Sequence, residues 1–114
     1  MRGMSITQPY ASLIALGEKT IEVRSWRTNY RGELLICASA RPKFDLRYPV
    51  GVTICVAELW DIREFMREDE ILSRAKWERG LHSWMLRDVR PVAQVPIKGS
   101  LGLFSIPREI WEKI

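Results

Sequence analysis

The strand-like segments of this chain follow one another too closely for a sheet built from parallel crossovers. Apolar or alternating runs typical of strands occupy residues 4–6, 20–26, 33–40, 51–62 and 82–92, with one or two short strands within 94–106. Helical spacing is confined to 7–19, to one or two short helices within 63–80, and to 107–114. A parallel crossover needs a dozen or more residues between its strands. The chain therefore predicts an α+β fold, a small mixed or antiparallel β-barrel with peripheral helices.

The length of 114 residues favours one domain spanning residues 1–114, which buries roughly 65% of its unfolded surface without needing disulfides. Cys37 and Cys55 lie in apolar strand-like runs, so we expect unpaired thiols in a reducing compartment. No apolar run approaches the ~20 residues of a membrane span, and the N-terminus lacks a signal-peptide pattern. These features predict a cytoplasmic protein without a membrane partner.

The charge balance favours an anionic partner. Lys and Arg number 18 against 14 Asp and Glu, a net charge of +4, and nucleic acid is the first candidate for a basic domain. Many ordinary domains are mildly basic, so charge alone fits both cases. The chain has one histidine, His82, and no zinc-ligand spacing, phosphate-binding loop or GxGxxG motif. We therefore expect neither a metal ion nor a cofactor.

The segment from 7 to 26 changes from a helical period to a period of two. In TQPYASLIALGEK, Thr7 is expected to cap the helix and Gly17 to stop it, because glycine tolerates the left-handed conformation after a helix. The following TIEVRSW alternates, so its polar face carries Glu22, Arg24 and Trp26. Guanidinium beside indole suits stacking on a base and gripping a phosphate; the same residues also suit an ion pair that covers a sheet face.

Two further sets of charged residues are candidates. Glu58 interrupts an apolar row formed by alternate residues of the longest strand, so it is either paired or neutral inside a site, or simply solvated at the strand end. Lys19 follows the helix stop, where a cation is also favoured by the helix dipole. In the loop 41–50, Arg41 and Lys43 either contact phosphate or are solvated.

The order of motifs resembles the ASCH domain family, named after the activating signal cointegrator. The stretches are MSITQPYASLIALGEKTIEVRSW, YRGELLICAS, VAEL, SWMLRDVRPV and PIKGSLGLF. The family signature GxKxxExR is met by Gly17, Lys19, Glu22 and Arg24. The QPYASLI and RSW stretches make the chain most similar to the cointegrator-type branch.

The resemblance implies a PUA-like barrel that binds nucleic acid, RNA more than DNA, or a nucleotide, in a cleft lined by the signature. In that cleft Lys19 and Arg24 would hold phosphate or a base carbonyl, and Trp26 or Tyr10 would stack on a base. Glu22 and Glu58 would read base donors. We therefore expect the charged residues of the signature to surround one concavity together with Glu58.

Some relatives in the family are enzymes, so the resemblance also allows a hydrolase. An amidohydrolase of N4-acetylcytidine uses a lysine, a threonine three residues later and a downstream glutamate; another relative cleaves RNA. Lys19 and Glu58 match the first and last, whereas Glu22 occupies the threonine position. In an enzyme, Lys19 and Glu58 would be the catalytic residues. A protein-binding adaptor is a third alternative.

Overall fold

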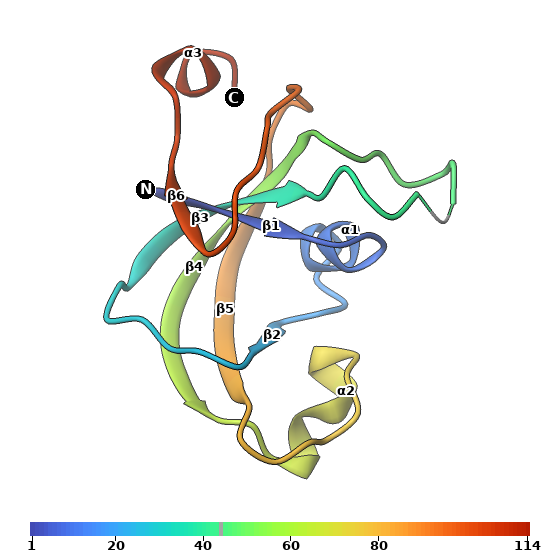
Figure 1. Cartoon of the computed structure of the whole chain (residues 1–114), viewed down its shortest axis with the longest axis vertical. Helices are drawn as coiled ribbons and strands as arrows, with labels where there is room; N and C mark the ends of the chain where they lie inside the picture. The colour runs from blue at the N-terminus through green and yellow to red at the C-terminus, as the bar shows by residue number, and fades with distance from the viewer. Residues whose placement is uncertain (44) are drawn as a thin grey trace.

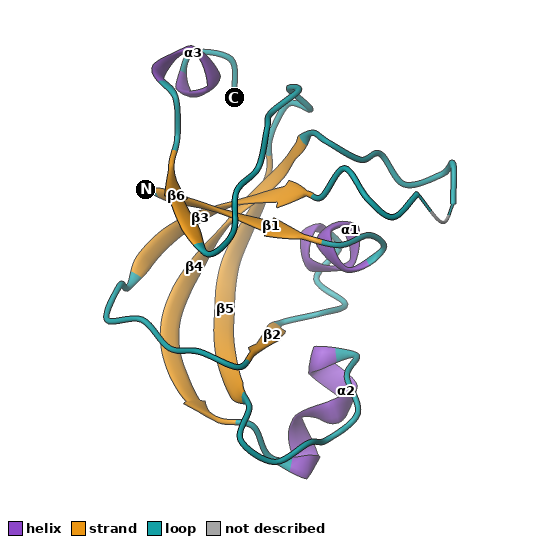
Figure 2. Ribbon diagram, in the orientation of Figure 1, coloured by secondary structure: helices purple, strands orange, loops and turns teal. Residues whose placement is uncertain are grey.

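Six strands form one curled sheet in the order β2-β5-β4-β3-β1-β6. The computed structural model describes residues 1–43 and 45–114. The strands are β1 (Arg2–Ile6), β2 (Ile21–Arg24), β3 (Gly32–Ala38), β4 (Thr53–Glu64), β5 (His82–Pro91) and β6 (Leu103–Ser105). The helices are α1 (Tyr10–Ala15), α2 (Glu70–Ser73) and α3 (Arg108–Trp111), with a 3-10 turn, η1 (Arg67–Asp69), before α2. Figure 2 shows α3 and α2 at opposite ends of the molecule, with α1 between them beside the curved strands.

The sheet is mixed, because β1 pairs with β3 in parallel and every other neighbouring pair is antiparallel. The strands β2 and β6 end up at opposite edges of the sheet although the sheet curls (Figure 1). The predicted α+β class, a mixed barrel with peripheral helices, is therefore confirmed, as a half-barrel. The predicted order of strands and helices is also the observed one.

Two apolar clusters hold the sheet from its two faces. The inner cluster lies within the curl and is built around Leu34, Ile36, Leu59, Trp84 and residues of α1. The outer cluster lies beneath the C-terminal segment and α3, and consists of Leu35, Cys37, Val56, Val95, Ile106 and Ile110. Consecutive residues of β3 therefore supply opposite clusters, as expected from the two-residue period of a strand.

The first helix ends as the sequence predicts but begins differently. Tyr10 is the first residue of α1 and Pro9 its N-cap, without a side-chain cap, so the expected capping role of Thr7 is wrong. Gly17 has a φ of +78°, and the N–H groups of Gly17 and Glu18 donate to the carbonyls of Ile14 and Leu13. This is the Schellman arrangement, which explains the glycine of the signature.

The long strand β4 does not keep one face throughout. Its pairing with β3 shifts register near Ile36 and Cys37, and consequently Ile54 and Cys55 both join the inner cluster while Val56 joins the outer one. The apolar row expected from alternate residues of this segment is therefore split. A β-bulge inserts one extra residue and exchanges the faces beyond it.

Cys37 and Cys55 are buried and unpaired, which confirms the predicted free thiols. Burial raises the pKa of each thiol to about 12, because the thiolate loses its hydration there. In the part of the chain that the structure describes, no helix has the length and apolar character needed to cross a membrane.

Candidate nucleic-acid interface

Three charged residues of the signature form one ion cluster, here called the signature triad: Lys19, Glu22 and Arg24. The Glu22 carboxylate lies 3.2 Å from Lys19 Nζ. Its other oxygen accepts a hydrogen bond of 2.9 Å from Arg24 Nε and forms an ion pair of 2.8 Å with a terminal guanidinium nitrogen of Arg24. Glu22 is buried because it lies opposite Trp84 of β5, on the inner face of the sheet. The strand therefore carries its charges inward, and they neutralise one another there.

The ammonium group of Lys19 is fully engaged in contacts with the protein itself. Besides the Glu22 contact, Nζ donates to the carbonyls of Ile21 and Ser73, so all three ammonium protons have acceptors. Lys19 is only 3% exposed. Burial lowers the pKa of Lys19 and the Glu22 carboxylate opposes this shift. The residue supplies a fixed, paired positive charge and ties β2 to the end of α2.

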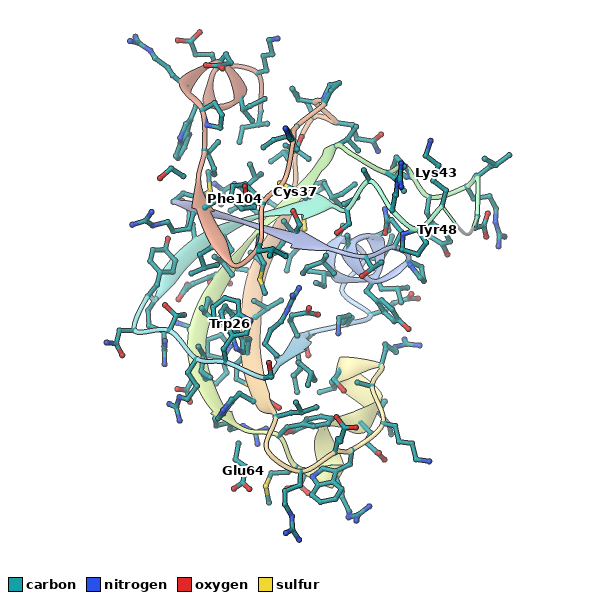
Figure 3. All side chains as sticks on the ribbon, in the orientation of Figure 1. Trp26, Cys37, Lys43, Tyr48, Glu64 and Phe104 are labelled. Atoms are coloured by element: carbon teal, nitrogen blue, oxygen red, sulfur yellow. The ribbon has the colours of Figure 1, made fainter. Side chains whose placement is uncertain are left out.

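Arg24 at the end of β2 and Trp26 just beyond it are also packed against other parts of the fold. Arg24 donates to the carbonyl of Ser5 on β1 at 3.0 Å. Trp26 packs edge-on against Trp84, with ring centroids 4.7 Å apart, and its carbonyl accepts a hydrogen bond from the Trp84 indole. Figure 3 labels Trp26 within the curve of the sheet. The indole is half-buried and holds this side of the half-barrel together.

A cavity of about 390 Å³, here called the signature cleft, opens beside Lys19 and Glu22 of the signature triad, whereas Arg24, expected around the same concavity, is absent from its lining. It is lined by Ile6, Thr7, Tyr10, Lys19, Glu22, Val23, Ser73, Arg74, Ala75 and Lys76. The lining includes three cations against one carboxylate. The ring of Tyr10 is 39% exposed, and Lys19 Nζ lies 5.5 Å from its centre. The cleft therefore offers an aromatic surface in a positively charged setting.

The sequence did not predict the wall of the cleft that follows α2. Arg74 and Lys76 are exposed and line it. They lie there because Lys19 holds the Ser73 carbonyl and the N–H of Thr20 donates to Leu72. Arg74 itself adopts a left-handed φ of 59°, uncommon for a side chain of this size, which turns the chain along the cleft. The sequence signal that could have indicated this wall is the pair of cations Arg74 and Lys76, which lie two residues apart after an amphipathic stretch.

The turn before α2 is fixed by a buried carboxylate. Asp69 accepts hydrogen bonds from the backbone N–H of Met66, the hydroxyl of Ser83 and the guanidinium of Arg63. Burial alone would raise the pKa of Asp69, but these donors lower it overall. Through Ser83, the carboxylate thus fastens to β5 the segment that leads to Arg74.

Glu58 does not share the concavity, and that expectation is wrong. Its carboxylate accepts a hydrogen bond of 2.9 Å from Arg87, which also lies over Trp60. Its neighbour Leu59 belongs to the inner cluster, so Glu58 projects from the outer face of the sheet. The signature triad lies on the inner face, because Glu22 is opposite Trp84, a residue of the inner cluster.

The remaining predicted residues lie at different places. Tyr10 lines the signature cleft, as described, whereas Trp26 is absent from its lining. Arg41 and Lys43 are exposed and belong to the loop that projects away from the sheet, on which Figure 3 labels Lys43 and Tyr48. Among the described residues, no three His, Cys, Asp or Glu side chains gather in a way that could hold a metal ion.

The sequence model of the ASCH domain matches residues 4–96 of the chain, a range that includes the signature triad and the whole lining of the cleft. The chain belongs to the ASCH domain family. Its length outside that range contains β6 and α3, which cover the outer cluster. The family assignment from the motifs is therefore confirmed, and this ASCH domain carries the GxKxxExR signature as an internal ion cluster.

Known proteins are similar to this ASCH domain in part of the sequence and in fold. Human activating signal cointegrator 1 is 50% identical over 38 residues, which are 33% of this chain and 6% of that protein. The chain thus spans a small fraction of the length of this relative. The crystal structure of ASCH from Zymomonas mobilis superimposes with a TM-score of 0.71 at 19% identity, covering 98% of this chain and 91% of that one. A tyrosine-to-phenylalanine variant of the same protein gives 0.70 at 17% identity, covering 98% and 94%.

Proposed function

We propose that this ASCH domain binds single-stranded nucleic acid, RNA in preference to DNA, with one nucleotide in the signature cleft. The observation that carries the proposal is the half-exposed ring of Tyr10 beside the exposed cations Arg74 and Lys76 in one cavity. Aromatic rings stack on any base, and exposed cations contact phosphate. The family is generally thought to bind RNA, which supports the choice of ligand.

Five of the lining residues have a part in the proposed complex. Tyr10 stacks on the base, while Arg74 and Lys76 contact the adjacent phosphates. Glu22 keeps acceptor capacity beyond its two cations and accepts from a base amino group. The hydroxyl of Thr7 lines the same cavity and can pair with a ribose 2′-hydroxyl, the group that distinguishes RNA from DNA.

The test is fluorescence anisotropy with labelled RNA and DNA of one length, each single- and double-stranded, across a salt series. We expect single-stranded RNA to bind most tightly, with log affinity falling by ~0.7 per phosphate contact for each unit of log salt. Absence of binding to every probe at the lowest salt would contradict the proposal.

The hydrolase alternative has less support from the geometry. Lys19 donates to three acceptors, so its ammonium is engaged, and Glu58 lies on the outer face with Arg87. A general acid or base must reach the reacting group within hydrogen-bond distance. Incubation of acetylated cytidine and of single-stranded RNA with the protein, followed by chromatography, tests this alternative; turnover abolished by Lys19→Met would favour it.

A further inference from the structure

A second cavity adjoins the signature cleft across β1. It has a volume of about 400 Å³ and is lined by Ser5, Cys37, Ala38, Ser39, Ala40, Ile97, Lys98, Gly99, Ser100 and Leu101. We call it the serine cavity. Figure 3 labels Cys37 at the end of β3, beside the loop that follows β5. Ser5 lines the serine cavity and the next two residues line the signature cleft, so the end of β1 separates the two cavities.

The lining of the serine cavity has donors and no acid. Lys98 is its one charged residue and is exposed. Within the described part of the chain, the hydroxyls of Ser5, Ser39 and Ser100 make no hydrogen bond to protein. The backbone N–H groups of residues 98–100 likewise donate to no acceptor among the described residues. Unpaired N–H and O–H donors around an ammonium group select an anion with several oxygens, such as a phosphate.

Gly99 lets the loop approach Ser5 of β1 closely at this cavity. A Cβ at Gly99 would lie 2.2 Å from Ser5 Oγ and 3.4 Å from Ser5 Cβ, so a side chain at residue 99 would force the Ser5 hydroxyl to turn away from its present position in the cavity. Backbone amides can therefore approach a ligand in this cavity closely, which is a recurrent use of glycine at phosphate sites.

The wall between the two cavities is held in place by a hydrogen bond. Arg24 lines neither cavity, but its guanidinium donates to the carbonyl of Ser5, the residue of β1 that lines the serine cavity next to Ile6 and Thr7 of the signature cleft. Neighbouring residues of a strand are ~3.3 Å apart along it. A strand of nucleic acid with a base in the signature cleft therefore passes within reach of the serine cavity.

Resting on the proposed function, we propose that the serine cavity is a phosphate subsite for a backbone phosphate of the strand whose base lies in the signature cleft. Lys98 provides the charge, and the hydroxyls of Ser5 and Ser100 donate to the phosphate oxygens. The test uses single-stranded RNA in which one linkage at a time is replaced by an uncharged methylphosphonate, measured by anisotropy with the wild-type protein and with Lys98→Ala.

At one linkage, we expect the neutral replacement to weaken wild-type binding ~5- to 10-fold. The same replacement should have little further effect on Lys98→Ala, because both changes remove one contact and are therefore not additive. Arg79→Ala, which removes an exposed cation before β5 that lines neither cavity, is the charge-matched control and should remain additive at every linkage. Additivity at all linkages with Lys98→Ala would overturn the subsite.

Two further measurements separate the possible outcomes. Gly99→Ala should lower RNA affinity by a similar factor while leaving binding of the uncharged-linkage RNA unchanged, since the new methyl group enters the cavity. Amide chemical shifts of Gly99 and Ser100 under titration with inorganic phosphate identify the source of the anion: saturation by free phosphate without a linkage effect would contradict the subsite for a strand. One outcome would remove only this inference and leave the proposed function intact. In it, Tyr10→Ala abolishes RNA binding, while the effects of Lys98→Ala and of the neutral linkages on affinity are additive.

Discussion

Arg24 donates a hydrogen bond of 3.0 Å to the carbonyl of Ser5, nineteen residues earlier in the chain. The two residues belong to β2 and β1, which are separated by three strands in the sheet order. The contact therefore closes the open side of the half-barrel with a side chain in place of strand pairing. It gives the arginine of the signature a structural role alongside any contact with a ligand.

Loss of the shared carboxylate should destabilise the fold. In Glu22→Gln, the buried Lys19 and the half-buried Arg24 remain side by side without an anion, so we expect the free energy of unfolding to fall by about 3 kcal/mol. Urea denaturation with a common m-value measures this change. Glu112→Gln breaks an exposed pair with Arg108 and should change stability by no more than ~0.5 kcal/mol. Equal stability of the two variants would contradict the buried triad.

We expect Trp26 to contribute to the stability of the fold more than to RNA binding. Trp26→Ala removes the edge-on contact with Trp84 and part of the inner cluster, so we expect a loss of about 2–3 kcal/mol. Trp111→Ala, on α3 and 47% exposed, is the matched control and should cost less than ~1 kcal/mol. A normal unfolding midpoint for Trp26→Ala together with reduced RNA binding would instead restore the predicted stacking role.

The two thiols predict a loss of stability in alkali. Their pKa is raised to about 12 in the fold against a usual value of 9.0, so the stabilisation is complete below pH 9 and is lost as the pH rises towards 12. Each thiol contributes ~1.4 kcal/mol per pH unit in that window. Between about pH 8 and about pH 10, the wild type should lose about 2–3 kcal/mol more than the variant with both Cys37→Ala and Cys55→Ala.

Lys19 acts in the opposite direction in the same window, because its lowered pKa makes the folded state release its proton first and stability rise with pH. This contribution is common to the wild type and the double-alanine variant, so it cancels in the comparison. Parallel curves of stability against pH for the two proteins would contradict the raised thiol pKa values.

Substitutions in the signature cleft should distinguish the contribution of base stacking to RNA affinity from that of phosphate contacts. Tyr10→Ala should lower RNA affinity by ~1–3 kcal/mol with an unchanged salt slope, because stacking releases no counterions. Lys76→Ala should reduce the slope by ~0.7. Arg108→Ala removes an exposed cation from α3 and should leave both quantities unchanged.

The loop cations provide a second comparison for the same RNA. If Arg41 and Lys43 contact phosphate, Arg41→Ala and Lys43→Ala should each reduce the salt slope by one contact or less. They project from the sheet and do not line the cleft, so we expect smaller effects than for Lys76→Ala. Slopes that fall only with the loop variants would move the binding surface away from the cleft.

The order of the strands and helices and the local part of the site follow from the sequence alone. Helical and two-residue periods are properties of short segments, so the order of strands and helices followed directly from them. Gly17 stops α1, so Lys19 lies just before β2 and Glu22 lies on it, three residues apart and in contact. Tyr10 lies beside Lys19 because only one short helix separates them.

The identity of the distant residues that join this site depends on how the sheet packs. Lys19 bonds to the carbonyl of Ser73, 54 residues away, and this contact brings Arg74 and Lys76 to the cleft. Glu58 is excluded because β-bulges exchange the faces of β4. A residue's face follows from its sequence period only within one uninterrupted strand, whereas bulges and contacts between distant segments depend on how the whole sheet packs.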